Sequence, residues 1–121
     1  MITDKGRLIA MDPLMDFVAR LKNKVQVAGL TNVEVIQRDA LNTGLDAKTI
    51  DVVLLFGVLP FATLPLKQLL PEMHRVLKSQ GSLAVWLFPT TAGVPTAIDR
   101  SGLFKEPGKK NGVYLYMPVT D

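Results

Sequence analysis

One unbroken apolar run, residues 52–56, most constrains what this chain can fold into. The run Val-Val-Leu-Leu-Phe is rich in valine and leucine and is closed by Gly57. A continuous apolar run of this length is typical of a strand that is buried on both faces, as strands in parallel sheets are. We therefore expect a parallel sheet that contains residues 50–56.

A second apolar run, residues 81–87, follows this strand, and the stretch between the two runs has helical spacing. Polar residues alternate there with apolar ones in the pattern of an amphipathic helix. The apolar positions of this helix are Leu66, Leu69, Leu70, Met73, Val76 and Leu77. Gly81 is expected to supply the turn after the helix. Strand, helix and strand then form a β-α-β unit.

Strands and helices alternate along the rest of the chain. An acid followed by proline, Asp12-Pro13, predicts a helix start, because the acid can cap and proline suits the first helical position. The predicted elements are strands at 7–11 and 33–36, a helix from Asp12-Pro13 to Gly29 between them, one or two helical turns within 95–100, and antiparallel strands at 104–106 and 113–117. This order predicts an α/β fold, a three-layer α/β/α sandwich with an antiparallel edge at its C-terminal end.

Length and composition narrow the possible functions. The chain has 121 residues, no cysteine and a net charge of +3, with basic residues spread along its length. One domain at most fits this length. The lack of cysteine excludes disulfides and thiolate metal sites, and we predict a cytoplasmic protein without a metal site. The scattered basic residues argue against nucleic-acid binding, and no apolar stretch is long enough to span a membrane.

Ligands of open parallel sheets bind beyond the carboxyl ends of the strands. Four places in this chain have that position: Asp12 after the first strand, Asp39 after the second, 57–60 after the third and 89–91 after the fourth. The only histidine, His74, lies in the helix and away from these ends. We predict that His74 faces solvent.

Five segments of the chain carry a family pattern in their order and spacing. They are GRLIAMD (6–12), AGLTNVE (28–34), RDA (38–40), IDVVL (50–54) and EMHRVLKSQG (72–81). Together they resemble the class I S-adenosylmethionine-dependent methyltransferases, most of all the small-molecule branch with the ubiquinone and menaquinone biosynthesis enzymes. The resemblance implies a Rossmann-like methyltransferase fold with S-adenosylmethionine as cofactor. It makes residues 1–121 a single partial domain, with a core at 6–88 and a C-terminal loop, short helix and hairpin at 89–121.

The resemblance places the adenosine part of the cofactor at two acids. In the family, an acid at the end of the second strand binds both ribose hydroxyls, and Asp12 holds that place; a carboxylate accepts two hydrogen bonds in fixed geometry. An acid at the end of the third strand contacts the adenine amino group, and Asp39 holds that place. The neighbouring contacts implied are the backbone N–H of Ala40 and the apolar surfaces of Met11, Pro13 and Leu41.

Each acid also has a purely structural interpretation. Asp12 could cap the helix that follows it, and Asp39 could cap a turn. Without the surrounding family pattern the structural roles would be the better interpretation, because caps are common and ligand contacts are rare. With the pattern, the cofactor roles are favoured.

The chain departs from the family in the glycine-rich loop. In the family, a first strand, a Gly-x-Gly-x-Gly loop and a first helix lie upstream of the position of Gly6, and the loop lets the backbone approach the methionine part of the cofactor. Only five residues precede Gly6. We therefore expect an N-terminally truncated fold that lacks the first strand, the loop and the first helix.

The missing strand is central in the family, whose strand order is 3-2-1-4-5-7-6. Without it, the strands at 7–11 and 50–56 lose a shared neighbour and expose bare edges that invite pairing. We predict a homo-oligomer formed through these edges. Direct pairing of the two strands and a complement from another polypeptide are the alternatives.

The predicted function is that of a methyltransferase-like domain for a small or hydrophobic acceptor. Residues 56–61 are apolar where members that act on amino groups of DNA or protein often have Asn-Pro-Pro-Tyr. Proximity can carry methyl transfer without a dedicated acid or base, and the sequence assigns no catalytic residue. Without the glycine loop, the chain alone is expected to bind the cofactor weakly or not at all. The alternative is a non-enzymatic, self-associating remnant: the acids Asp12 and Asp39 favour the enzyme, and the absent loop favours the remnant.

Overall fold

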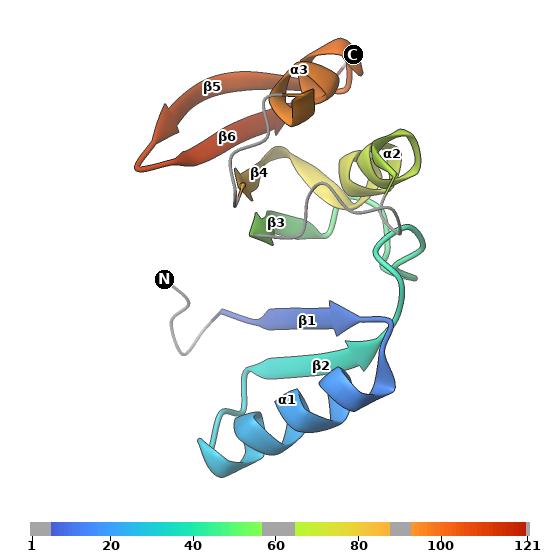
Figure 1. Ribbon diagram of the computed structural model, residues 1–121, viewed down its shortest axis with the longest axis vertical. Helices are drawn as coiled ribbons and strands as arrows, with labels where there is room; N and C mark the ends of the chain where they lie inside the picture. The colour runs from blue at the N-terminus through green and yellow to red at the C-terminus, as the bar shows by residue number, and fades with distance from the viewer. Residues whose placement is uncertain (1–5, 57–64, 88–92, 121) are drawn as a thin grey trace. The chain divides into compact units, whose positions relative to one another are not determined.

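Figure 1 shows the computed structural model, which describes residues 6–56, 65–87 and 93–120. The predicted ligand positions at 57–60 and 89–91 lie outside the described residues. The chain divides into two units, residues 1–44 and 45–121, and each is described here by itself. Among the described residues, no helix has both the length and the apolar character needed to cross a membrane.

The first unit is a parallel strand pair with a connecting helix. β1 (Leu8–Asp12) pairs in parallel with β2 (Val33–Gln37), and α1 (Met15–Val27) lies between them in the chain. The pairing is in unbroken register and ends with Asp12 opposite Gln37. The strand, helix and strand predicted for this part of the chain are confirmed.

The predicted glycine, Gly29, terminates α1 two residues after Val27, its last helical residue. Gly29 has a φ of 69°, and its N–H donates to the carbonyl of Gln26 at 3.1 Å. The N–H of Leu30 reaches back to the carbonyl of Val25, also at 3.1 Å. This pair of bonds is a Schellman motif, which needs the left-handed conformation that glycine adopts without strain.

The apolar side of α1, which carries Val18 and Leu21, is only partly covered. Val18 on this face is 1% exposed, whereas Leu14 and Leu21 are 56% and 38% exposed. The sheet of this unit has only two strands, so its surface is too small to cover the whole apolar side of a 13-residue helix. α1 therefore keeps apolar side chains in contact with solvent.

The second unit is a four-stranded sheet of order β3-β4-β6-β5. β3 and β4 are parallel, and β6 is antiparallel to both β4 and β5. The elements are β3 (Ile50–Phe56), α2 (Leu66–Val76), β4 (Leu77–Trp86), α3 (Gly93–Arg100), β5 (Phe104–Lys110) and β6 (Val113–Pro118). The central β-α-β unit and the antiparallel C-terminal edge are both confirmed.

A two-residue turn closes the β5–β6 hairpin. Asn111 and Gly112 have φ angles of 53° and 81°, which is the type I′ turn that Asn-Gly favours. β5 is longer than the predicted strand at 104–106 and reaches Lys110, with an irregular register between Lys105 and Gly108. The two lysines at 109 and 110, which precede the turn, are exposed.

The core of the second unit lies on one face of its sheet. It joins alternate strand side chains to the inner faces of α2 and α3. The buried residues on these elements include Leu55, Leu69, Met73, Val76, Leu83, Val85, Ile98 and Tyr116.

The other face of this sheet is uncovered at β3. Val52 and Leu54 are 53% and 56% exposed, so the prediction that this strand is buried on both faces is wrong. Leu54 lies in one row with Ala84 and Leu115, and Leu115 is 37% exposed. β3 is an edge strand of its sheet, and an edge strand has a neighbouring strand on one side only.

His74 does not face solvent freely, which corrects the prediction for it. Its Nε2 donates to the carbonyl of Val119 at 2.8 Å, and its ring stands edge-on to Phe104 with the centroids 5.7 Å apart. The side chain is half-buried. The reason is a long-range contact: the end of the chain returns alongside α2, which local spacing in the sequence does not reveal.

Gly81 is required because backbone atoms of other residues approach it closely, and not because it forms a turn with positive φ. α2 passes directly into β4 at Leu77, and the β3–β4 register shifts between Ile50 and Val52. A Cβ atom at Gly81 would stand 2.8 Å from the carbonyl oxygen of Asp51 and 3.0 Å from that of Lys78. The predicted role of Gly81 is therefore wrong, although a glycine is still required there.

We predict that Gly81→Ala destabilises the protein. Because both obstructing atoms belong to backbone, the cost should resemble that of overpacking, about 1–3 kcal/mol of unfolding free energy in urea titrations. Gly108→Ala is the matched control, since Gly108 lies in β5 of the same sheet and a Cβ atom there would have no neighbour within 4 Å. Equal losses from the two variants would contradict the steric explanation.

Candidate functional site

The candidate site lies at the carboxyl ends of β1 and β2. The in-register pairing sets Asp12 opposite Gln37, and Asp39 follows two residues beyond. The N–H of Arg38 donates to the carbonyl of Asp12 at 3.2 Å, and Gln37 Nε2 donates to the carbonyl of Pro13 at 3.2 Å. These bonds bring the predicted acids Asp12 and Asp39 to one edge of the sheet.

Asp12 is the last residue of β1, and its carboxylate organises the turn that follows. Oδ1 accepts a hydrogen bond from the N–H of Leu14 at 2.8 Å, which is an Asx turn. α1 begins at Met15 with Leu14 as its N-cap residue, so the predicted helix start at Asp12-Pro13 is wrong. An acid can shape the turn between a strand and a helix without capping the helix itself.

Asp39 makes the same local arrangement after β2. Its Oδ1 accepts a hydrogen bond from the N–H of Leu41 at 2.9 Å, and its carbonyl accepts one from the N–H of Asn42 at 2.9 Å. Ala40 and Leu41 are half-buried, whereas Asp39 is exposed. The predicted structural role of Asp39 in a turn is confirmed.

The two Asx turns leave each carboxylate with a second oxygen. Within the described part of the chain, Oδ2 of Asp12 and Oδ2 of Asp39 have no hydrogen-bond donor. An ionised carboxylate accepts hydrogen bonds only, through up to four lone-pair positions. The edge therefore suits a ligand that presents hydroxyl or amino donors.

Sequence reasoning missed a contact between Arg38 and the loop that follows Asp39. Its guanidinium lies so close to Gly44 that a Cβ atom there would overlap it, and Gly44 has a φ of 74°. Thr43, next to Gly44, is only 5% exposed. The loop after Asp39 thus packs back onto the residue before it. In the sequence, the glycine at position 44 is the feature that could have indicated how closely the Arg38 side chain approaches this loop.

The other predicted site residues at this edge, Pro13, Ala40 and Leu41, are apolar. Pro13 is exposed beside Asp12, and Met11 is half-buried. His74 belongs to the other unit and is bonded to Val119. Within the described ranges, no group of three or more His, Asp or Glu residues could hold a metal ion.

Comparison with known protein families identifies the domain. A family model described as a methyltransferase domain matches residues 2–85. The chain belongs to this methyltransferase-domain family. No curated protein sequence matches the chain.

Solved structures share the fold of this methyltransferase domain at low sequence identity. A SAM-dependent methyltransferase from Aquifex aeolicus has a TM-score of 0.80 and 23% identity, over 96% of this chain and 71% of that one. The PH0226 protein from Pyrococcus horikoshii OT3 has a TM-score of 0.77 and 20% identity, over 93% of this chain and 72% of that one. The [4+2]-cyclase SpnF has a TM-score of 0.74 and 19% identity, over 85% of this chain and 44% of that one.

These likenesses confirm the predicted Rossmann-like methyltransferase fold. The strand orders agree as well: β2-β1 and β3-β4-β6-β5 correspond to 3-2 and 4-5-7-6 of the family order on either side of its first strand. The ubiquinone and menaquinone branch stays a prediction.

Proposed function

We propose that this methyltransferase domain binds S-adenosylmethionine and acts on a small or hydrophobic acceptor. The observation that carries the proposal is the pair of turn-fixed carboxylates, Asp12 and Asp39, at the carboxyl edge of β1 and β2. The structure from Aquifex aeolicus, which is titled a SAM-dependent methyltransferase, supports the choice of cofactor.

The residues at this edge fit the adenosine part of that cofactor. Ribose hydroxyls and the adenine amino group are donors, and the second oxygens of Asp12 and Asp39 are acceptors without a described donor. Asx turns hold both carboxylates in place, so little ordering is needed on binding. Pro13, Ala40 and Leu41 would form the apolar border of the adenine. When bound, the cofactor supplies the methyl group that the acceptor takes up.

The methionine part of the cofactor has less support in this chain. The 121 residues contain no Gly-x-Gly-x-Gly sequence, and a side chain would block the close backbone approach that such a loop provides. We therefore propose that the chain alone binds the cofactor weakly and is weakly active or inactive. No catalytic residue is proposed.

Binding of two ligands separates the two halves of the proposed site. We predict that S-adenosylhomocysteine and 5′-methylthioadenosine bind with affinities within about threefold of each other, because only the adenosine that both ligands share has partners in the site. If the amino-acid part of S-adenosylhomocysteine also made good contacts, every ~1.4 kcal/mol of additional binding free energy would make its Kd about tenfold lower. Asp12→Asn should weaken both about 10- to 100-fold, since a hydrogen bond to a charged group contributes about 1.5–3 kcal/mol. Amide chemical shifts followed in ligand titrations measure both effects.

The variant Asp12→Asn is chosen because it retains an oxygen for the Leu14 N–H and so keeps the turn. Asp16→Asn is its control, since Asp16 is an exposed acid in the first turn of α1 and is not among the residues proposed to contact the cofactor. S-adenosylhomocysteine binding ten times or more tighter than the thioadenosine would contradict the half-site proposal. Absence of binding by either ligand to the folded chain would favour the alternative, a non-enzymatic remnant of the fold, which the missing glycine loop supports.

The edges of the two sheets support self-association of the chain. The edge strand β5 carries exposed lysines at 105, 109 and 110, and the edge strand β2 carries exposed Glu34 and Gln37. Natural sheets protect their edges in this way. In contrast, residues 8–11 of β1 and 52–56 of β3 contain no charge. We propose that the unprotected edges of β1 and β3 pair in a homo-oligomer. We also propose a cytoplasmic location for the protein, which the lack of cysteine supports.

We predict that Leu54→Lys lowers the oligomeric mass measured by sedimentation equilibrium. Leu54 is on edge strand β3, where a lysine would disfavour pairing with a second copy. Leu115→Lys is the matched control, because Leu115 is also exposed and lies in the same row, but on the interior strand β6. Equal loss of mass from both variants would show association through the sheet face, and a monomeric parent chain would refute self-association altogether.

A further inference from the structure

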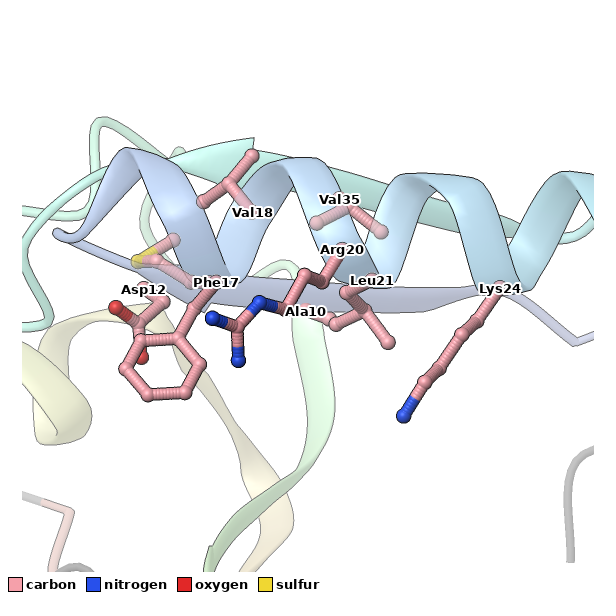
Figure 2. A pocket seen from close by; sticks show the side chains of 9 residues that line it. Ala10, Asp12, Phe17, Val18, Arg20, Leu21, Lys24 and Val35 are labelled. Atoms are coloured by element: carbon pink, nitrogen blue, oxygen red, sulfur yellow. The ribbon is translucent and has the colours of Figure 1, made fainter.

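An open groove runs along α1 in the first unit, and the proposed function does not use most of it. Its volume is about 320 Å³. Figure 2 shows the side chains that line it, drawn from β1, α1 and β2. Ala10, Met11, Val18 and Val35 provide apolar lining from the strands and the inner side of the helix. Phe17 and Leu21, which are 54% and 38% exposed, add large apolar side chains from α1.

Two positively charged side chains lie beside this apolar surface. Arg20 and Lys24 line the groove and extend from the same side of α1 as Phe17 and Leu21 (Figure 2). The guanidinium carbon of Arg20 lies 5.8 Å from the centre of the Phe17 ring. Among the described residues, neither Arg20 nor Lys24 forms an ion pair with a carboxylate. The one acid in the lining, Asp12, is at the other end of the groove from Lys24.

The spacing of these residues sets the shape of a fitting partner. Positions 17, 20, 21 and 24 are three and four apart, so their side chains form a stripe along two turns of α1, about 10 Å in length. Helices pack together through ridges with this spacing, and amphipathic helices bind into apolar grooves through anchors at the same intervals. An elongated partner parallel to the α1 axis therefore matches the stripe better than a compact small molecule does.

We propose that this groove docks an amphipathic helix of another polypeptide, whose apolar stripe covers Phe17 and Leu21 and whose carboxylates pair with Arg20 and Lys24. Charge complementarity selects an acidic partner, because two cations without a described ion pair lie beside the apolar surface. The groove extends from Asp12 toward Lys24, away from the carboxyl edge that is proposed to hold adenosine. Asp12 lines both the groove and the proposed adenosine site, whereas the docking residues Phe17, Arg20, Leu21 and Lys24 lie on α1 and have no proposed contact with adenosine.

Two designed peptides test the proposal on the complete chain. Both are 18-residue helices with the same leucine stripe; one has glutamates beside the stripe and the other has lysines. Fluorescence anisotropy of the labelled peptides should show the glutamate peptide binding at least tenfold tighter than the lysine peptide. The double variant Arg20→Glu with Lys24→Glu should reverse this preference. Phe17→Ala should weaken the binding of both peptides.

The control double variant is Lys22→Glu with Lys67→Glu. Both lysines are exposed, neither lines the groove, and the change in net charge is the same. The control should keep the preference for the glutamate peptide. Equal binding of the two peptides, no binding of either, or reversal by the control would overturn the proposal. A loss of oligomeric mass in the Arg20 and Lys24 variant without peptide would also overturn it, because a second copy would then occupy the groove.

Discussion

The parallel backbone pairing of β1 with β2 is the interaction on which the proposed site depends. Because the register is unbroken, the two strands end together, with Asp12 opposite Gln37. Each strand then continues into an Asx turn, and the Arg38 N–H joins the two turns through the carbonyl of Asp12. A shift of one residue would turn every side chain to the opposite face and separate the two acids. The proposed adenosine site is therefore a consequence of strand register.

The same pairing leaves β1 with a second side that has no partner strand among the described residues. The Leu8 N–H donates to the Asn32 carbonyl, and in a strand the donors alternate, so the N–H groups of Ile9 and Met11 point away from β2. β3 is likewise an edge strand with β4 as its neighbour. Residues 8–11 of β1 and 52–56 of β3 contain no charge, whereas the edge strands β2 and β5 carry exposed charged or polar side chains. This distribution of charge is the observation that supports the proposed pairing through β1 and β3.

Local pattern in the sequence predicted most of the elements and the position of Asp12 and Asp39 at the carboxyl ends of the first two strands, whereas their cofactor roles rest on the family resemblance. The apolar run at 52–56, the helical spacing at 66–77 and the glycine at 29 each correspond to an observed strand, helix or helix end. Apart from the start of α1 and the length of β5, the errors concern contacts that local pattern does not encode. His74 meets Val119, 45 residues away, and Gly81 meets the backbone of Asp51 in a neighbouring strand. The exposure of Val52 and Leu54 depends on which elements cover the sheet, and no periodicity reports that.

Amide hydrogen exchange of β1, followed as protein concentration rises, tests the paired-edge account most directly. The account predicts slow exchange of Ala10, whose N–H faces β2, at every concentration, and exchange of Ile9 and Met11 that slows as the oligomer forms. The alternation of slow and fast amides should therefore disappear with assembly. Rapid exchange of Ile9 and Met11 in a sample of full oligomeric mass would contradict pairing through this edge.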